Sequence, residues 1–470
     1  MKVMKFGGAC LTKGEDILKI ARIVKEENEP VALVISAIHN VTNLLIKGLE
    51  LALESEEYVP IIIEEIRERH QQIIQEAITE EEKQEEIITT INEKIQKLER
   101  LYYGVAFTEE IIDSVRAIIL SYGEALATKL VAFVLRTQGI NAQAKESNES
   151  GIITTHSFTN ATAKLAEIKD NLQKSLLPFM KEGGIPVITG FYGCTPEGKI
   201  TIFGRNGTDY SAAVIAYGLD VQELVIWKNV AGFMTADPKL VSNARKISQL
   251  SFYEAAELAY FGATILHPRT LAPLIDSQIN IEIRNINDPK SAGTKIHPMG
   301  YKKDGIIKSV TYNEEIAVLK IQGPGVGYKP GIIGKIGNKL AEIGVNIFSV
   351  ITAQTCINLL LHRRDGKKSQ QAIQGLLEEE VEQIIIEEDI ALIAVVGEGL
   401  LTTKGLAAKV FSAVAEQNVN IEMISAGASE VAYYFIIKQK SIKVAIKAIH
   451  STFFGKRKKT FVIPKQGIAF

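Results

Sequence analysis

An internal repeat in the last third of the chain limits its fold more than any other feature of the sequence. Six residues match six others at a constant offset of 74, namely Gly323, Gly325, Gly331, Val345, Asn346 and Ile347 with Gly397, Gly399, Gly405, Val419, Asn420 and Ile421. Each copy reads as a strand, a glycine turn, a helix (332–343 or 406–417), a strand that begins at Val-Asn-Ile, and a further strand. This order is half of a ferredoxin-like βαββαβ module, so we expect two such units.

The first 300 residues alternate between short β-branched runs and helical stretches, which indicates a mostly parallel α/β sheet. A helical stretch over about 16–27 separates two strand-like runs at 3–6 and 31–35. Further strand-like runs lie at 187–191, 200–203, 223–227 and 281–284.

The segment 43–118 between these runs is amphipathic and rich in charge, with Pro60 and Gly104 as its breakers. Such a pattern predicts several helices that cover one side of the sheet. Whether these helices move as a lid is left open.

The composition excludes several classes of protein. The 470 residues carry a formal net charge of −2, which gives no long-range attraction to nucleic acid. Cys10, Cys194 and Cys356 fit neither a metal-binding spacing nor a disulfide framework. The N-terminus has no signal-peptide pattern, and no apolar run approaches the ~20 residues of a membrane span. We therefore expect a cytoplasmic protein without a nucleic-acid or membrane partner.

A polar, glycine-containing segment at 204–212 is the strongest candidate for a binding site. It reads Gly-Arg-Asn-Gly-Thr-Asp-Tyr-Ser-Ala and places Arg205 and Asp209 beside glycines that allow a ligand to come close. An apolar helical pattern follows, so the polar residues should lie at a helix start, where free N–H groups and the helix dipole favour phosphate or carboxylate. A capped loop whose charges pair with each other is the alternative.

Common nucleotide-binding and metal-binding motifs are absent from the sequence. There is no Gly-x4-Gly-Lys-Ser/Thr, and the segment 323–328 departs from Gly-x-Gly-x-x-Gly at its last position, so we expect neither a P-loop nor a Rossmann site. The segment 362–365, His-Arg-Arg-Asp, mimics part of a kinase catalytic loop but lacks the downstream Asn, and we interpret it as a strand and a turn. The seven histidines show no ligand spacing, which argues against a histidine metal site.

Several motifs in the first 300 residues occur in an order that resembles the catalytic domain of aspartokinases, members of the amino-acid kinase superfamily. They are Lys5-Phe-Gly-Gly, Ser36 with Val41-Thr-Asn, Ser121-Tyr-Gly-Glu124, the segment 204–212, the segment 227–238, and the segment 261–269. The repeat resembles the paired ACT domains of the same family. The resemblance implies a three-layer α/β sandwich with a mostly parallel central sheet at 1–300, followed by ACT units at 315–390 and 391–470.

The segments 204–212 and 397–405 resemble the kinase half of bifunctional aspartokinase-homoserine dehydrogenases more than the short aspartokinases. After the second ACT unit, however, the sequence reaches Phe470 without a Gly-x-Gly-x-x-Gly motif. We therefore expect a monofunctional kinase without dehydrogenase activity.

The resemblance also implies a role for individual residues. Lys5 and Asp209 would be catalytic, with Lys5 reaching the phosphates and Asp209 orienting Lys5 or the reacting groups. Arg205 would bind the α-carboxylate of the amino acid and Glu124 its ammonium group, while hydroxyl contacts would come from Thr42 and Thr208. The nucleotide would be bound by Phe6, Gly7, Gly8, Ser36, Trp227, Lys228, Asn229, Met234, Asp237 and Lys239.

Positions on the nucleotide side depart from the commonest family pattern. Lys228 and Asn229 stand where the family has Thr-Asp, and other replacements occur at Met234, Lys239 and Thr264. Since a lysine is lost at Thr264 and another is gained at Lys228, we hypothesise that Lys228 replaces it in function.

The activity implied is the ATP- and Mg²⁺-dependent phosphorylation of the β-carboxylate of L-aspartate to 4-phospho-L-aspartate, the first step of lysine, threonine and methionine biosynthesis. A β-carboxylate with a pKa near ~3.9 is already ionised at neutral pH and needs no general base, which agrees with the absence of a histidine base. Two alternatives stay open: another carboxylate kinase of the superfamily, such as one acting on glutamate, and a catalytically impaired amino-acid sensor.

The ACT resemblance further implies feedback regulation by an end-product amino acid and a homodimer formed through the ACT units. The effector would bind at Gly331, Val345, Asn346, Ile347, Asn420 and Ile421. The sequence does not decide between lysine and threonine as this effector.

Overall fold

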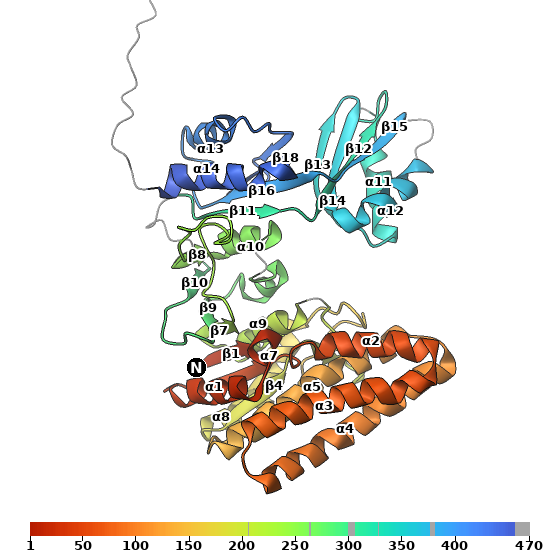
Figure 1. Ribbon diagram of the computed structural model, residues 1–470, viewed down its shortest axis with the longest axis vertical. Coiled ribbons are helices and arrows are strands. Elements are labelled where there is room, and N and C mark those ends of the chain that lie inside the picture. Colours follow the sequence, from red (N-terminus) through yellow and green to blue (C-terminus); the bar gives the residue numbers. More distant parts are fainter. Residues whose placement is uncertain (205, 263–264, 299–305, 328, 377–380, 456–470) are drawn as a thin grey trace, which may run out of the picture. The chain divides into compact units, whose positions relative to one another are not determined.

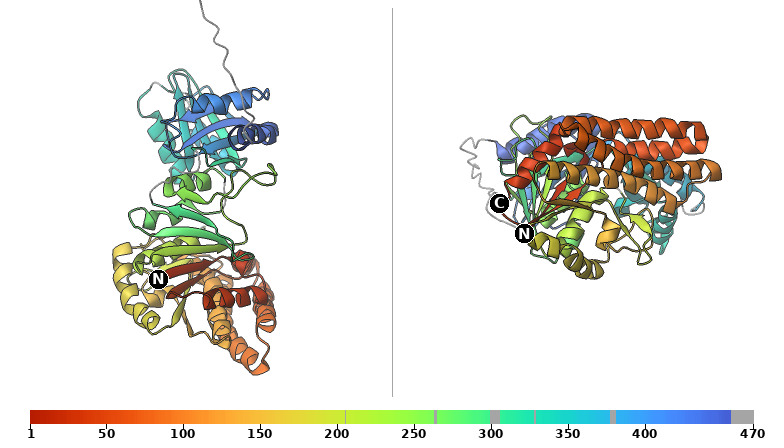
Figure 2. Two further views of the ribbon diagram at one scale, coloured as in Figure 1. Left: turned by 90° about the vertical axis from the view of Figure 1, so that its left-hand side faces the viewer. Right: turned by 90° about the horizontal axis from the view of Figure 1, so that it is seen from below.

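The computed structural model describes residues 1–204, 206–262, 265–298, 306–327, 329–376 and 381–455 (Figures 1 and 2). The chain divides into two compact units. Unit 1 consists of 1–233, 246–260 and 264–303, and unit 2 of 234–245, 261–263 and 304–470. The short segment 234–245 thus belongs with the C-terminal part of the chain. The expected division into 1–300, 315–390 and 391–470 stays a prediction.

Unit 1 is built on an eight-stranded sheet with the order β3-β4-β2-β1-β7-β9-β10-β8. Neighbouring strands are parallel except β9 and β10, so the expected mostly parallel sheet is confirmed. β1 and β2 are almost wholly buried, which suits their apolar sequences in a parallel sheet. The strands are β1 Lys2–Phe6, β2 Val31–Ile35, β3 Ala142–Lys145, β4 Ile185–Thr189, β7 Glu223–Lys228, β8 Gln249–Ser251, β9 Asn280–Asn285 and β10 Thr294–His297.

The helices of unit 1 form two groups that pack on this sheet. In one group α5 contacts β3 and β4 as well as α1, α2 and α4; in the other α9 contacts β1, β7 and α7. The helices are α1 Gly14–Lys25, α2 Val41–Glu54, α3 Val59–Ala77, α4 Glu81–Thr108, α5 Asp113–Thr137, α6 Ser147–Ser150, α7 Leu165–Ser175, α8 Leu177–Lys181, α9 Gly207–Gly218 and α10 Phe252–Tyr260.

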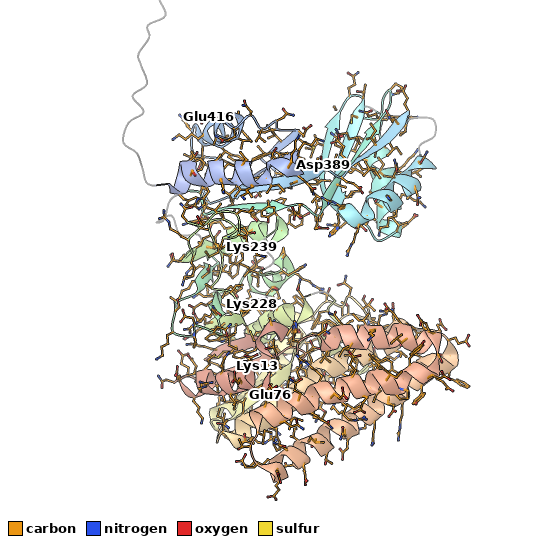
Figure 3. The ribbon with its side chains drawn as sticks, viewed as in Figure 1. Lys13, Glu76, Lys228, Lys239, Asp389 and Glu416 are labelled. Atoms are coloured by element: carbon orange, nitrogen blue, oxygen red, sulfur yellow. The ribbon has the colours of Figure 1, made fainter. Side chains whose placement is uncertain are left out.

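The predicted helical segment 43–118 forms α2, α3, α4 and the start of α5 (red to orange in Figure 1). Its apolar side chains share one buried cluster with residues of β1 and β2. His70 is fully buried in this cluster and donates from Nδ1 to the carbonyl oxygen of Ile66 at 2.7 Å. Glu76 of α3 (Figure 3) accepts a hydrogen bond from the Gly14 N–H at 2.8 Å, which supplies a negative charge to the N-terminus of α1.

The helix α5 is, among the described residues, the one long and apolar enough to cross a membrane. However, 83% of its apolar window is buried inside the protein. This burial is what a core helix of unit 1 requires, and α5 also carries the buried Glu124.

Unit 2 contains both copies of the repeat, and each copy contributes to a four-stranded antiparallel sheet. The first has the sheet order β13-β14-β12-β15 and the complete βαββαβ sequence of β12 Ile316–Gln322, α11 Ile332–Glu342, β13 Ile347–Ala353, β14 Cys356–His362, α12 Gly366–Gln374 and β15 Gln383–Glu387. The second has the order β11-β16-β18-β17 and consists of β11 Ser309–Asn313, β16 Ile390–Val396, α13 Leu406–Ala415, β17 Met423–Ala426, β18 Ala432–Lys438 and α14 Ile442–Phe454.

The repeat predicted from the sequence is confirmed, since α11 and α13 begin at Ile332 and Leu406. One feature was not expected: the strand β11, which completes the second sheet, precedes the first copy in the chain. The first copy is therefore inserted between β11 and the rest of the second.

Two further predictions have different outcomes. The run at 200–203 forms β6 Ile200–Ile202, but this strand pairs antiparallel with β5 Tyr192–Cys194 outside the main sheet, so its expected place there was wrong. The segment 362–365 lies at the end of β14 and in a short 3-10 turn, Arg363–Asp365, which confirms a strand and a turn.

Candidate active site

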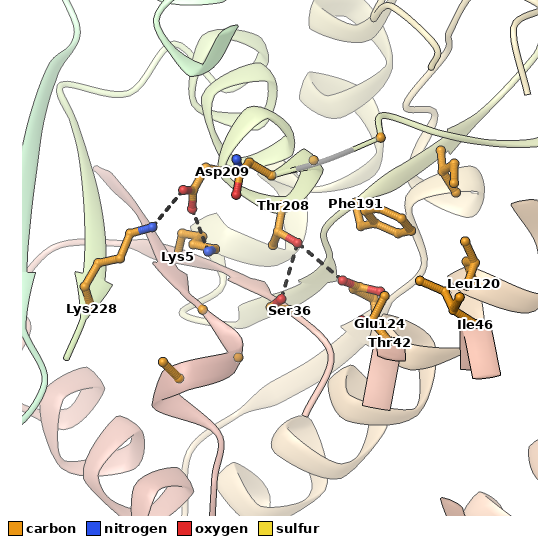
Figure 4. A pocket seen from close by; sticks show the side chains of 17 residues that line it. Lys5, Ser36, Thr42, Ile46, Leu120, Glu124, Phe191, Thr208, Asp209 and Lys228 are labelled. Carbon is orange, nitrogen blue, oxygen red and sulfur yellow. Dashed lines mark hydrogen bonds and ion pairs between the residues drawn. The ribbon is translucent and has the colours of Figure 1, made fainter. Parts of the chain in front are cut away.

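A cavity of about 570 Å³ lies at the carboxyl ends of the parallel strands β1, β2 and β7 (Figure 4). Open α/β sheets usually bind their ligands at this edge. The cavity is lined by Lys5, Gly7, Gly8, Ala9, Ser36, Thr42, Ile46, Leu120, Glu124, Phe191, Ile202, Gly204, Asn206, Gly207, Thr208, Asp209 and Lys228.

The helix α9 begins at this cavity, as the polar segment 204–212 predicted. Asn206 precedes the helix in the left-handed conformation, with φ 58°, and the Gly207 N–H donates to the carbonyl oxygen of Gly204 at 3.0 Å. The following turns of α9 are buried. This packing holds Thr208 and Asp209 in the first turn, where the helix dipole favours negative charge.

Two lysines from neighbouring strands contact one buried carboxylate at one end of the cavity. Lys5 of β1 lies 2.6 Å from Oδ1 of Asp209, and Lys228 of β7 donates to Oδ2 at 2.9 Å (Figure 4). Lys5 and Asp209 are only 5% and 4% exposed. Burial by itself would raise the pKa of Asp209, but the charges of Lys5 and Lys228 outweigh it and lower the pKa to about 2. Burial lowers the pKa of Lys5, and the charge of Asp209 opposes this shift. Two lysines around one carboxylate supply more cationic than anionic groups, which suits a phosphate group.

A second carboxylate, Glu124 of α5, lines another part of the cavity. Its Oε1 accepts a hydrogen bond from the Thr208 hydroxyl at 3.3 Å, and that hydroxyl lies 3.4 Å from the Ser36 hydroxyl (Figure 4). The other oxygen, Oε2, is buried and has no hydrogen-bond partner among the described residues. Burial raises the pKa of Glu124 to about 8. The backbone N–H of Ala37 and the Thr208 hydroxyl counteract this shift only in part, so the buried carboxyl group is suited to receive a cation.

Glycines beside Thr208 and Glu124 allow the elements to approach closely. A Cβ on Gly190 would lie 2.2 Å from Cγ2 of Thr208, and a Cβ on Gly123 would lie 2.9 Å from Cβ of Ala37. The positions of both polar side chains therefore depend on the absence of a side chain at these two residues.

The structure brings most of the predicted site residues together. Nine of them line the cavity: Lys5, Gly7, Gly8, Ser36, Thr42, Glu124, Thr208, Asp209 and Lys228. Arg205 and Thr264 lie outside the described residues. The side chains of Phe6 and Trp227 are buried and stack on each other with ring centroids 5.9 Å apart.

The remaining predicted nucleotide residues do not line the cavity. Asn229 is exposed after β7. Met234, Asp237 and Lys239 belong to unit 2, where the Ser309 hydroxyl donates to the Met234 carbonyl oxygen at 2.7 Å. The hydroxyl of Tyr312 donates to the carboxylate of Asp237 at 3.2 Å, and the side chain of Lys239 is exposed (Figure 3). Their assignment to the nucleotide stays a prediction.

The apolar wall of the cavity was missed by the sequence analysis. It consists of Ile46, Leu120, Phe191 and Ile202. Phe191 has φ 69°, a left-handed conformation that is strained for an aromatic residue and that often marks a functional site. The dipeptide Gly190-Phe191 after β4 is a weak turn signal, but nothing in the sequence separates the other three residues from the core.

The predicted effector residues lie at corresponding places in the two copies of the repeat. Gly331, with φ 89°, caps the N-terminus of α11, and Val345, Asn346 and Ile347 lead into β13. Asn420 and Ile421 lie just before β17. Asn346 and Asn420 are exposed, and the Asn420 amide donates to Glu422 at 3.1 Å. Their role as an effector site stays a prediction.

Two family models match this chain. The model described as the amino acid kinase family matches residues 1–285, and an ACT domain model matches residues 393–453.

Individual relatives match over nearly the whole length of the chain. It is 30% identical to "Aspartokinase 1, chloroplastic" of Arabidopsis thaliana over 483 residues, which cover 99% of this chain and 82% of the relative. It is 28% identical to the bifunctional aspartokinase/homoserine dehydrogenase of Buchnera aphidicola, and there the match covers 97% of this chain but 57% of the relative. The chain thus spans little more than half of that bifunctional protein.

Solved structures of E. coli aspartokinase III are similar to this fold, with a TM-score of 0.81. The complex of that protein with aspartate and ADP, in the R-state, is 26% identical and covers 97% of this chain and 100% of the other. The complex with lysine and aspartate, in the T-state, is 25% identical and covers 97% and 99%.

Proposed function

Because the chain belongs to the amino acid kinase family, and within it to the aspartokinases, we propose that it transfers the terminal phosphoryl group of ATP to the side-chain carboxylate of L-aspartate. The observation that carries this proposal is the pairing of two opposite environments in one cavity. One is the Lys5, Asp209 and Lys228 cluster, and the other is the buried, half-satisfied carboxylate of Glu124. An acidic amino acid suits this cavity, because its ammonium group can face Glu124 while its side-chain carboxylate faces the phosphates near the lysines.

Glu124 is proposed to bind the α-ammonium group of the substrate. Its Oε2 has no hydrogen-bond partner among the described residues, and an ammonium group would supply both a hydrogen bond and a compensating charge. Thr208 holds the other oxygen, so the carboxylate is oriented before the substrate arrives. Thr42 and Ser36 also line this cavity, where their hydroxyl groups could contact the substrate.

Lys5 and Lys228 are proposed to bind the phosphates and to neutralise the charge on the transferred group. The attacking carboxylate is ionised at neutral pH, so the enzyme has mainly to align two anions and reduce their repulsion. The Asp209 carboxylate contacts one lysine through each of its oxygens and so holds both cations in a fixed geometry for this task. Gly7 supports the close approach, because a Cβ there would lie 3.1 Å from Nζ of Lys5.

ATP and Mg²⁺ are proposed as the nucleotide and its cation. Mg²⁺ needs one or two carboxylates besides the phosphates and would supply further neutralisation of their charge. Both oxygens of Asp209 already contact lysines, so the phosphates themselves would be the main ligands of this cation.

Regulation by an amino acid is proposed to act through the ferredoxin-like units. Lysine is the first candidate, because the related E. coli aspartokinase III was crystallised with lysine and aspartate. Threonine is the second candidate. We also propose a cytoplasmic homodimer that associates through these units, which size-exclusion chromatography with light scattering would test.

A coupled trapping assay tests the activity. The protein is incubated with ATP, Mg²⁺, hydroxylamine and either L-aspartate or L-glutamate, and the hydroxamate formed from the acyl phosphate is measured. Hydroxamate with aspartate supports the proposal, and hydroxamate with glutamate alone would replace it by another carboxylate kinase. No hydroxamate with either substrate would favour an amino-acid sensor. In that case the unfolding temperature of the protein should rise when lysine or threonine is added.

A further inference from the structure

Arg269, just after β8 and α10 in the chain, makes an unusual set of contacts in unit 1. Nη1 donates to the carbonyl oxygen of Phe203 at 2.6 Å and to Oδ1 of Asn160 at 2.9 Å, and Nη2 donates to the carbonyl oxygen of Ala161. The guanidinium carbon lies 4.4 Å from the centre of the Tyr210 ring. One side chain thus contacts three separate segments of the chain.

These contacts surround the segment that carries the polar residues at the start of α9. Phe203 directly precedes Gly204, and Tyr210 directly follows Asp209. The third contact, the turn at 159–161, lies against Gly204 itself, because a Cβ there would be 3.3 Å from the Thr159 carbonyl oxygen. Arg269 therefore contacts the chain immediately before and immediately after 204–209.

We propose that Arg269 is a positioning residue, which holds the start of α9 through its contacts with Phe203 and Tyr210 and so fixes Thr208 and Asp209 in the cavity. This inference rests on the proposed function, because the role of Thr208 and Asp209 at the substrate is itself a proposal. The contacts of Arg269 do not depend on that role. Arg269 does not line the cavity and acts through the residues it holds.

The contacts need a guanidinium group. A planar group with fixed donors can hold two carbonyl oxygens and an amide oxygen while its face stacks on an aromatic ring. A lysine ammonium carries the same charge but cannot combine this fork with stacking. Arg269→Lys should therefore resemble Arg269→Ala, whereas a requirement for charge alone would be met by lysine.

Phe203 and Tyr210 depend on this arrangement for their own positions. Their rings contact each other edge to face at 5.0 Å, and the Phe203 N–H donates to the carbonyl oxygen of Phe191 at 2.9 Å. The Tyr210 hydroxyl accepts from the Ala163 N–H at 3.2 Å. Loss of Arg269 would remove the cation that stacks on Tyr210, and the strained Phe191 would lose indirect support.

The test compares Arg269→Ala and Arg269→Lys with Arg136→Ala in the full-length protein. Arg136 is a matched control, because it donates to the carbonyl oxygen of Ala142 at 3.2 Å and lies 5.3 Å from the Phe133 ring, away from the cavity lining. In the hydroxamate assay both Arg269 variants should raise the KM for aspartate ~10-fold or more and also lower kcat, since Thr208 on the amino-acid side and Asp209 beside the two lysines both lose their position. Arg136→Ala should change neither.

Hydrogen exchange measured by mass spectrometry gives a second readout that does not need activity. Peptides covering 203–210 should exchange faster than in the wild type in the Arg269 variants, and at the wild-type rate in Arg136→Ala. Asn160→Ala, which removes one contact from an exposed residue, gives a milder variant if Arg269→Ala does not fold, and should show a smaller change in the same direction.

An unchanged KM for aspartate together with an unchanged kcat, restoration by lysine, or unaltered exchange over 203–210 would overturn the proposal. If the wild-type protein forms no hydroxamate, the proposed function fails, and the exchange experiment alone still decides the role of Arg269. If the wild-type protein is active and the variants equal it, Arg269 has no positioning role and the proposed function stands.

Discussion

Lys228 donates a hydrogen bond to Oδ2 of Asp209 at 2.9 Å, on the opposite oxygen from the one that Lys5 contacts. Lys228 comes from β7 and Lys5 from β1, two adjacent parallel strands. The sequence led us to hypothesise that Lys228 replaces a lysine missing at Thr264. Its place beside Asp209, in a cavity that is also lined by Gly7 and Gly8 after β1, supports this hypothesis, although Thr264 itself lies outside the described residues.

Replacing Lys228 should impair the use of ATP. We expect Lys228→Ala to lower kcat/KM for ATP by ~10²-fold, because one of two cations facing the phosphates is lost. Lys228→Arg, which keeps the positive charge, should recover part of the lost kcat/KM for ATP. Lys164→Ala, whose ion pair with Glu167 lies at the surface, is the control and should behave as the wild type. Initial rates at varied ATP check this, and an unchanged dependence on ATP would remove Lys228 from the site.

Glu124 should make the substrate-free protein less stable as pH rises. Its pKa is about 8 in the folded protein and 4.5 without burial, so the folded state binds more protons between these values. Its contribution to stability is therefore complete below pH 4.5 and is lost as pH rises through 8, by up to about 1.4 kcal/mol per pH unit. In urea unfolding at pH 5 to 8, the free energy of unfolding of Glu124→Gln should increase relative to that of the wild type as pH rises. Parallel curves for the two proteins would refute this.

The buried His70 has the opposite dependence on pH. Burial lowers its pKa to about 4 from 6.5, so the unfolded chain binds a proton that the folded protein resists. Stability should fall as pH drops from 6.5 to 4, by up to about 1.4 kcal/mol per pH unit. His70→Phe should remove that part of the slope. Thermal unfolding of both proteins at pH 7 and pH 5 measures it, and an equal loss in both would mean that His70 does not titrate there.

Asn346 should be required for feedback inhibition. It is exposed at the entry to β13, where the effector is proposed to bind. We expect Asn346→Ala to raise the lysine or threonine concentration for half inhibition by ~10-fold, because a polar contact to the effector would be lost, with little change in the uninhibited rate. Asn338→Ala, an exposed asparagine on α11, is the control. Unchanged inhibition in Asn346→Ala would count against this pocket.

The sequence predicted those parts of the site in which local pattern and chemistry coincide. The polar residues before an apolar helical run placed Thr208 and Asp209 at the start of α9, and the glycines after β1 marked the edge where Lys5 lies. The apolar wall could not be predicted, because Ile46, Leu120 and Ile202 follow the same patterns as core residues. Their role arises only when α2, α5 and β6 meet around the cavity.

Long-range pairing explains the remaining differences. β11 completes the second ferredoxin-like sheet by pairing Ser309 with Val396, and a separation of this size leaves no local signal in the sequence. The segment 234–245 similarly belongs to unit 2 because the Ser309 hydroxyl and the Tyr312 hydroxyl bind it there. The sequence motif of this segment was recognisable, whereas its contacts with Ser309 and Tyr312 could not be predicted.

Asp209 can be tested by comparing hydroxamate formation from ATP and L-aspartate by the wild-type protein and by Asp209→Asn, with the fold of both checked by circular dichroism. The asparagine keeps the size of the side chain but removes the charge that holds Lys5 and Lys228. We expect aspartyl hydroxamate from the wild type and a rate at least ~10²-fold lower from the variant, since both cations lose their common anchor. Equal rates from the two proteins, or no hydroxamate from the wild type, would contradict this expectation.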